Sequence, residues 1–298
     1  MQVSDVKVFG VIGSGQMGSG IAQVAAATGY KVLLLDVSKE IVDKAKGKIG
    51  SVLQKQVDKG KMTADARAAL LANIEPVSDV GAFSKADIAV EAATENTEIK
   101  LKLFRSVDEV LPKHAILASN TSSISITKLA AVTRRPEQVV GMHFMNPVPL
   151  MKLVEIVRGL QTSNETYATT AELARKMGKI VITSGDAPGF LVNRMLIPFL
   201  NEACFAFQEG LGTLEDIDQG AKLGLNHPMG PFELADLVGN DTLLFIAEVL
   251  HREFGDDKYR PATLLRNVVA AGWMGRKVGR GFYKYDDKGQ KVGNSFDR

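Results

Sequence analysis

The sequence predicts an α/β fold, in which a doubly wound sheet domain is followed by an all-α domain. Short apolar segments alternate with amphipathic ones up to about residue 187, and this alternation is typical of a parallel sheet with crossover helices. Beyond the Asp-Ala-Pro-Gly sequence at residues 186–189 the pattern is helical. The two patterns predict a sheet domain over residues 1–187 and a helical domain over 188–298.

Length and composition agree with two domains and point to no special partner. The chain has 298 residues, of which 45% are hydrophobic and 23% charged, as in ordinary globular proteins. With 36 basic and 34 acidic residues, neither a nucleic-acid nor a membrane partner is expected, and no metal site is expected. Cys204 is the only cysteine, so no intramolecular disulfide can form, and a cytoplasmic protein is the simplest expectation. We expect Cys204 to be buried in packing rather than to act as a nucleophile.

The elements of the first domain follow from apolar runs and helix signals. Ser38 has the side chain of an N-cap for a long helix. The expected strands are residues 6–12, 31–35, 87–92, 115–119, 139–143, 153–157 and 179–183. The expected helices are residues 21–27, 38–59, 95–111, 125–132 and 165–177.

The second domain is expected to contain helices and turns, with one short strand near residues 282–285. Residues 190–207 are apolar nearly all round, so this helix needs cover on more than one side. Pro188 is expected to start it and Pro198 to kink it. The tail from Asp286 is polar and is predicted to be disordered.

A glycine-rich turn between the first strand and the first helix predicts a Rossmann-type dinucleotide site. Gly13, Gly15 and Gly18 form GxGxxG, and Asp36 ends the next strand, 18 positions after Gly18. The glycines allow a tight turn, close approach of a pyrophosphate and close helix packing, while the helix N-terminus favours phosphates. Asp36 can bind the adenosine ribose and repel a 2′-phosphate, which favours NAD over NADP.

Three later segments resemble the 3-hydroxyacyl-CoA dehydrogenase family. They are Ser-Asn-Thr-Ser-Ser-Ile at 119–124, His-Phe-Met-Asn-Pro at 143–147 with Glu155 twelve residues after His143, and Asp-Ala-Pro-Gly-Phe-Leu-Val-Asn-Arg at 186–194. The resemblance covers nearly the whole chain except the polar tail. It implies reversible oxidation of a (3S)-3-hydroxyacyl-CoA, of the 3-hydroxybutyryl-CoA type, to the 3-ketoacyl-CoA with NAD.

The resemblance implies that His143 is the general base and acid and that Glu155 orients its ring. An imidazole can accept and return a proton near neutral pH, and a carboxylate on its other nitrogen fixes the tautomer. The two residues can meet if the strand after the proline loop returns beside the first. Two other interpretations stay open: His143 as a structural histidine, and Glu155 on the solvent face of an alternating strand.

Further site residues come from the same resemblance. Ser122 and Asn193 are implied to lie near the reacting oxygen, although each can instead cap a backbone segment. The implied cofactor contacts are Glu95, Lys100, Asn120 and Asn146. Glu95 and Lys100 can also be read as charges on a helix surface.

A row of lysines follows the dinucleotide site. Lys44, Lys48, Lys55 and Lys59 are spaced to share one face of a helix. Coenzyme A carries a 3′-phosphate and a pyrophosphate, so Lys55 and Lys59 are candidate substrate contacts. A solvated lysine stripe is the alternative interpretation.

The resemblance also implies a homodimer formed through the helical domain. Two alternative functions stay open: a related hydroxy-acid dehydrogenase similar to L-gulonate 3-dehydrogenase, and a catalytically silent NAD-binding protein. Acyl chain length, direction and pathway, fatty-acid metabolism among them, do not follow from the sequence.

Overall fold

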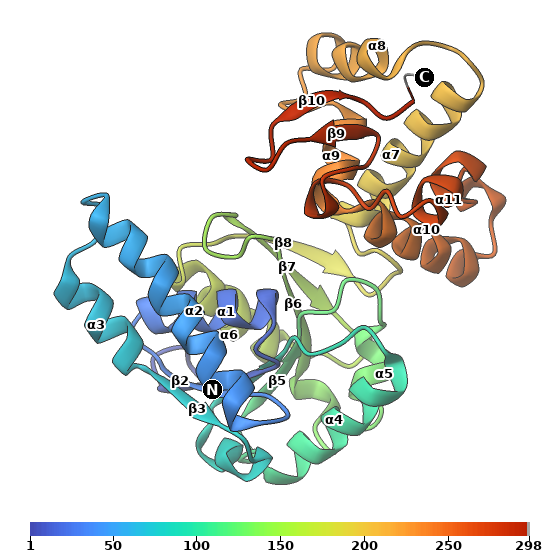
Figure 1. Cartoon of the computed structure of the whole chain (residues 1–298). Coiled ribbons are helices and arrows are strands. Elements are labelled where there is room, and N and C mark those ends of the chain that lie inside the picture. The colour runs from blue at the N-terminus through green and yellow to red at the C-terminus, as the bar shows by residue number, and fades with distance from the viewer. Residues whose placement is uncertain (297–298) are drawn as a thin grey trace. The chain divides into compact units, whose positions relative to one another are not determined.

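The computed structural model describes residues 1–296 and divides the chain into two compact units, Met1–Ala187 and Pro188–Arg298 (Figure 1). None of the helices formed by residues 1–296 combines the length and apolar character needed to cross a lipid bilayer.

The first unit is built on an eight-stranded sheet with the strand order β3-β2-β1-β4-β5-β6-β7-β8. All neighbouring strands are parallel except β6 and β7. The strands are β1 (Val8–Ile12), β2 (Lys31–Leu35), β3 (Ile74–Val77), β4 (Ile88–Glu91), β5 (Ile116–Ser119), β6 (Val139–Phe144), β7 (Leu153–Arg158) and β8 (Ile180–Gly185). The order reverses between β1 and β4, and doubly wound sheets bind ligands at the carboxyl ends of the strands at such a point.

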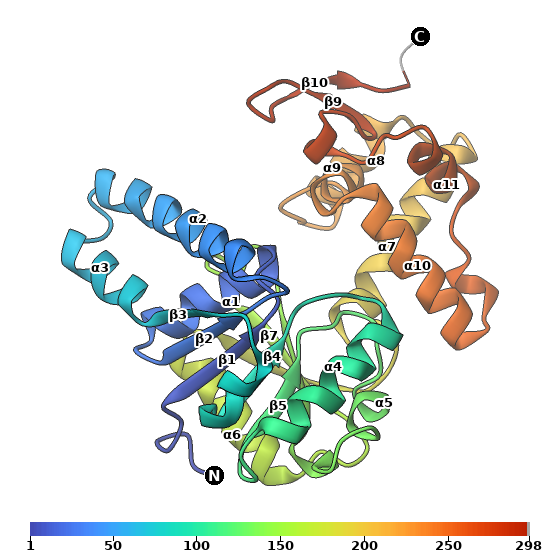
Figure 2. The ribbon, with the colours of Figure 1, turned by 60° about the horizontal axis from the view of Figure 1, so that its bottom comes forward.

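Helices lie on both sides of this sheet, as Figure 2 shows. They are α1 (Gln16–Ala27), α2 (Lys39–Asp58), α3 (Ala64–Ala72), α4 (Thr97–Val110), α5 (Ile126–Ala130) and α6 (Asn164–Lys176). Helix α2 illustrates how the sequence specifies them: the Ser38 side chain accepts a hydrogen bond from the Ile41 amide at its N-terminus. A buried stripe then faces the core at Val42, Ala45, Ile49 and Leu53.

Residues 64–77, for which the sequence predicted no element, form α3 and β3. Pro76 lies inside β3. Because proline is unusual in a strand, this residue hid the strand from the sequence prediction. Among the described residues β3 pairs only with β2, so it is an edge strand where a missing N–H is tolerated.

The second unit consists mainly of helices packed around one apolar core. They are α7 (Val192–Gln208), α8 (Leu214–Gln219), α9 (Pro231–Val238), α10 (Asn240–Phe254) and α11 (Thr263–Ala270). Cys204 is fully buried in this core, and burial raises the pKa of its thiol well above the ordinary range. The thiol is therefore protonated and packed, as expected.

Two expectations for the second unit were wrong. Helix α7 begins at Val192, four residues after Pro188. The polar tail is ordered over its described part: β10 (Lys291–Asn294) pairs antiparallel with β9 (Tyr283–Tyr285), and the aromatic ring of Phe296 packs against that of Phe282. A two-stranded hairpin at the surface needs few apolar residues, so polarity alone misled the prediction.

Candidate active site

The carboxyl ends of β1, β4, β5 and β6 meet at one edge of the sheet, because these four strands are parallel. The glycine-rich turn after β1 lies at this edge, and so does His143, which is the second-last residue of β6. Most candidate residues of the first unit, apart from the lysines, lie in or beside the segments that follow these strands.

The glycine-rich turn has the geometry of a phosphate cradle. Gly13 has φ +95°, and a Cβ atom on Gly18 would lie 1.8 Å from the Gly13 carbonyl oxygen, so a larger residue at 18 would force the turn apart. A Cβ at Gly15 would meet open space. No described side chain caps α1 and no acidic residue stands in its first turn, so its N-terminus suits an anion.

Asp36 follows β2 and is tied to the same turn. Its Oδ2 accepts hydrogen bonds from the Ser14 backbone N–H and Oγ, both at 2.7 Å, and its Oδ1 accepts one from the Val37 N–H at 2.8 Å. Partial burial raises the pKa of Asp36, but these hydrogen bonds outweigh it and the net pKa lies below the ordinary value. Asp36 is therefore a carboxylate at neutral pH, as its proposed ribose contact requires.

His143 and Glu155 face each other directly across β6 and β7. The antiparallel register pairs the two residues, and His143 Nδ1 lies 2.6 Å from Glu155 Oε2. Glu155 is fully buried and His143 is 7% exposed. The reading of Glu155 as a residue on a solvent face is therefore wrong, and the return of the second strand beside the first is confirmed.

Ser122 and Glu95 meet although 27 positions separate them. Glu95 Oε1 accepts hydrogen bonds from the Ser122 N–H at 2.9 Å and its Oγ at 3.3 Å. Helix α5 is capped by Ser125, so the reading of Ser122 as its cap is wrong. Glu95 precedes α4, which Asn96 caps, so Glu95 is not a helix-surface charge either.

Lys100 is buried, which overturns its reading as a surface charge. It is 1% exposed, and its ammonium forms an ion pair with the Glu91 carboxylate. Ser119 Oγ donates to Glu91 Oε2 at 2.8 Å, and the Ala93 N–H donates to Glu91 Oε1 at 2.8 Å. Sequence reasoning missed Glu91; the one available signal was an acidic residue inside an apolar run, at the carboxyl end of a strand.

The two asparagines connect neighbouring segments of this edge. Asn120 Oδ1 accepts from the Phe144 N–H at 2.9 Å and so joins the end of β5 to the end of β6. Asn146 Oδ1 accepts from Gln16 Nε2 at 2.9 Å, which links the loop after β6 to the first residue of α1.

The remaining candidates are Asn193 and the row of lysines. Asn193 is the second residue of α7 and belongs to the second unit. Lys44, Lys48 and Lys55 are exposed on α2, and Lys59 follows its last residue. The substrate contacts of Asn193, Lys55 and Lys59 stay predictions.

Comparison with known proteins identifies the family. Residues 8–187 match the NAD-binding domain of 3-hydroxyacyl-CoA dehydrogenase, and residues 189–285 match the C-terminal domain of that enzyme. The chain belongs to the 3-hydroxyacyl-CoA dehydrogenase family. It is an NAD-dependent oxidoreductase, and the predictions of fold class and cofactor are confirmed.

Individual members of the family are similar over almost their full length. A probable 3-hydroxybutyryl-CoA dehydrogenase of Deinococcus radiodurans is 53% identical over 277 residues, which are 93% of this chain and 99% of the relative. The human mitochondrial hydroxyacyl-coenzyme A dehydrogenase is 42% identical over 288 residues, 94% of this chain and 91% of the relative. The crystal structure of (S)-3-hydroxybutyryl-CoA dehydrogenase from Ralstonia eutropha has a TM-score of 0.92 at 48% identity, covering 95% of this chain and all of that one.

Proposed function

We propose that the chain interconverts (3S)-3-hydroxybutyryl-CoA, or a close 3-hydroxyacyl-CoA, and the corresponding 3-ketoacyl-CoA. The observation that carries the mechanism is the buried pair of His143 and Glu155, with Nδ1 and Oε2 2.6 Å apart. The names of the relatives at 49–53% identity favour the four-carbon substrate.

In the proposed oxidation His143 removes the proton of the C3 hydroxyl group through its second ring nitrogen. The C–H bond at C3 breaks with both electrons, and bound NAD supplies the hydride acceptor. Glu155 holds Nδ1 and stabilises the imidazolium that forms. In the reverse direction the imidazolium returns the proton to the developing alkoxide.

The other candidates receive supporting roles in this proposal. Ser122 and Asn193 hydrogen-bond the C3 oxygen and stabilise its charge in the transition state. Asp36 binds the adenosine ribose, and Lys55 and Lys59 meet the phosphates of coenzyme A. The nicotinamide half of the cofactor is assigned to Glu95, Lys100, Asn120 and Asn146.

We also propose that the protein is a homodimer formed through the second unit. The support is apolar surface there: Met195, Leu223 and Leu225 are 62%, 83% and 60% exposed. Burying such residues against a second copy removes apolar area from water, and a two-fold pair is the commonest closed arrangement.

The catalytic proposal is tested by following NADH absorbance with acetoacetyl-CoA. We expect His143→Gln to lower kcat by roughly 10²–10⁴, the usual worth of a positioned proton-transfer group, while NADH still binds. Glu155→Gln should cost a comparable factor and shift the pH profile of oxidation, because the imidazolium loses its carboxylate partner. A His143→Gln enzyme that keeps more than half of its activity would exclude His143 as the general base.

A further inference from the structure

The loop between β6 and β7, residues 145–152, joins the two strands that carry His143 and Glu155. Pro147 O accepts hydrogen bonds from the Leu150 and Met151 N–H groups, at 3.0 and 2.9 Å, which folds the loop into a tight turn. Val148 is 2% exposed, so this side of the loop is packed against the protein.

One side of this loop packs on helix α1, which begins at the glycine-rich turn. A Cβ atom on Gly20 would lie 2.8 Å from Val148 Cβ, so the missing side chain at Gly20 admits Val148. Asn146 bonds Gln16 in the same helix. The position of Asn146 therefore depends on how the loop sits on α1.

Lys179 binds the loop through two hydrogen bonds. This residue precedes β8, is 7% exposed, and donates from Nζ to Val148 O at 2.5 Å and to Met151 O at 2.8 Å. Among the described residues it forms no ion pair, so two neutral carbonyl groups replace the hydration of an ammonium group. Burial lowers the pKa of Lys179 accordingly.

We propose that Lys179 is a positioning residue for cofactor binding: by clamping Val148 and Met151 it seats the β6–β7 loop on α1 and thereby places Asn146. The inference rests on the proposed contact between Asn146 and the nicotinamide half of NAD. A side chain that served stability alone would need no link to Asn146, and this difference can be measured.

The test replaces Lys179 by Met, which keeps an unbranched chain but removes every donor. We expect the Kd for NADH, measured by fluorescence titration of the full-length enzyme, to rise about tenfold, equivalent to ~1.4 kcal/mol. The KM for NAD should rise in parallel, with kcat at saturating cofactor within about twofold, because the His143–Glu155 pair lies in the strands rather than the loop. A lower Tm with an unchanged Kd would overturn the proposal.

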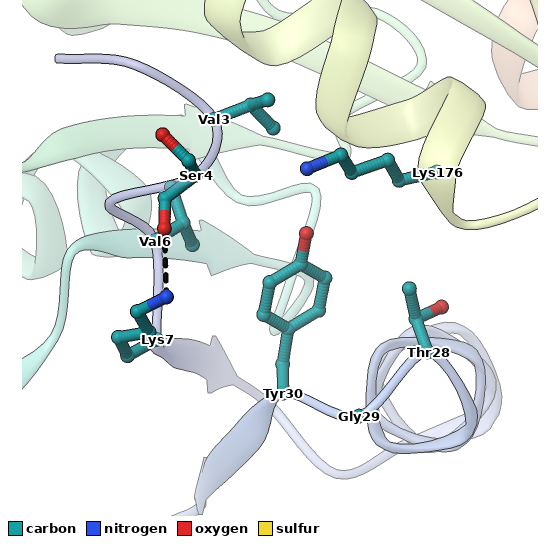
Figure 3. Close-up of a pocket in the computed structure, with 8 residues that line it drawn as sticks. All are labelled: Val3, Ser4, Val6, Lys7, Thr28, Gly29, Tyr30 and Lys176. Carbon is teal, nitrogen blue, oxygen red and sulfur yellow. Dashed lines mark hydrogen bonds between the residues drawn. The ribbon is translucent and has the colours of Figure 1, made fainter.

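Lys176 provides the matched control. It is an exposed lysine three positions earlier, and its side chain extends toward Tyr30 in an open pocket that Ser4 and Thr28 also line (Figure 3). Lys176→Met removes the same charge while Lys179 keeps its hydrogen bonds to the Val148 and Met151 carbonyl groups, so it should leave the Kd for NADH unchanged. An equal rise in both variants would mean that charge, not the clamp, affects binding, and would overturn the proposal.

A double-mutant cycle with Asn146→Ala tests the route of the effect. If Lys179 acts through Asn146, Lys179→Met should raise the Kd for NADH by less than twofold in the Asn146→Ala background. Full additivity would overturn the inference. An Asn146→Ala enzyme with unchanged Kd would remove the cofactor contact on which the inference rests, while the acetoacetyl-CoA assay would still report the proposed reaction.

Val148→Ala approaches the same loop from the other side and keeps the proposal testable if Lys179→Met does not fold. It leaves Lys179 in place but loosens the packing on Gly20. We expect the Kd for NADH to rise severalfold, because the loop that carries Asn146 would pack less tightly on α1. An unchanged Kd would contradict the role of the loop.

Discussion

His143 and Glu155 are twelve residues apart, yet the antiparallel return of β7 makes them direct neighbours. Their meeting could be predicted because a short proline loop between two apolar runs favours such a return. The contact between Glu91 and Lys100 was harder to predict, because neither glutamate nor lysine indicates burial by itself. Their ion pair depends on β4 and α4 coming together, which is a tertiary event.

Asp36 carries the first residue-scale prediction. The unmodified enzyme should prefer NAD to NADP by at least tenfold in kcat/KM, which needs only ~1.4 kcal/mol of discrimination. Asp36→Ala should narrow this ratio, mainly by weakening NAD, because the ribose loses its acceptor and Ser14 loses its partner. Initial rates with each cofactor measure the ratio.

Asp43→Ala is the matched control for this change. Asp43 is an exposed acid on α2 that pairs with Lys39, so its loss should leave the cofactor ratio unchanged. Equal use of NAD and NADP by the unmodified enzyme would be incompatible with the assigned role of Asp36.

At the scale of elements, the sequence was most informative where a capping side chain marks the start of a helix or where a short apolar run forms a strand. Ser38 identified the start of α2, and the strand over Lys31–Leu35 was predicted with its observed bounds. Prediction failed where tertiary position decides, as at Pro76 in an edge strand and in the polar hairpin after Tyr285. Such elements are held by neighbours rather than by their own propensity.

Helix α2 carries the element-scale prediction. Its buried stripe faces the core. Lys44, Lys48 and Lys55 lie on the other side of the helix, within roughly 40° of one another at 3.6 residues per turn, and Lys59 follows the last turn. If Lys55 and Lys59 meet the coenzyme A phosphates, replacing both by Ala should raise KM for acetoacetyl-CoA with little change in kcat, the pattern of lost uniform binding.

Two controls separate phosphate contact from a general charge effect. A truncated pantetheine thioester lacks the phosphates, so the double variant should use it as well as the unmodified enzyme does. Replacing Lys44 and Lys48 by Ala removes the same charge nearer the start of the helix and should leave KM for acetoacetyl-CoA within about twofold. An identical rise for both thioesters would refute phosphate contact.

At the scale of the molecule, the sequence predicted a doubly wound parallel sheet and a change to a helical pattern near residue 187, but not the strand order, in which β3 takes part. Alternating apolar segments imply parallel strands, and the strand order then reverses beside the first strand. The surface through which two copies associate is harder to predict, because the sequence pattern of a helix is the same whether an apolar residue faces the core or a partner. The exposed fraction of each side chain in the folded chain distinguishes core residues from candidate interface residues.

The dimer prediction follows from that exposure. Leu223 and Leu225 are 83% and 60% exposed in the second unit, and clustered apolar surface often marks an interface. Light scattering after size exclusion should give about twice the 32.1 kDa chain mass.

Leu223→Glu with Leu225→Glu should shift the full-length protein toward the monomer, because two carboxylates would have to be desolvated in the interface. Leu160→Glu is the control, since Leu160 is 88% exposed in the first unit, and it should leave the mass unchanged. A monomeric full-length protein at micromolar concentration would rule out the proposed dimer, and a dimer lost only on Leu160→Glu would place its interface on the first unit.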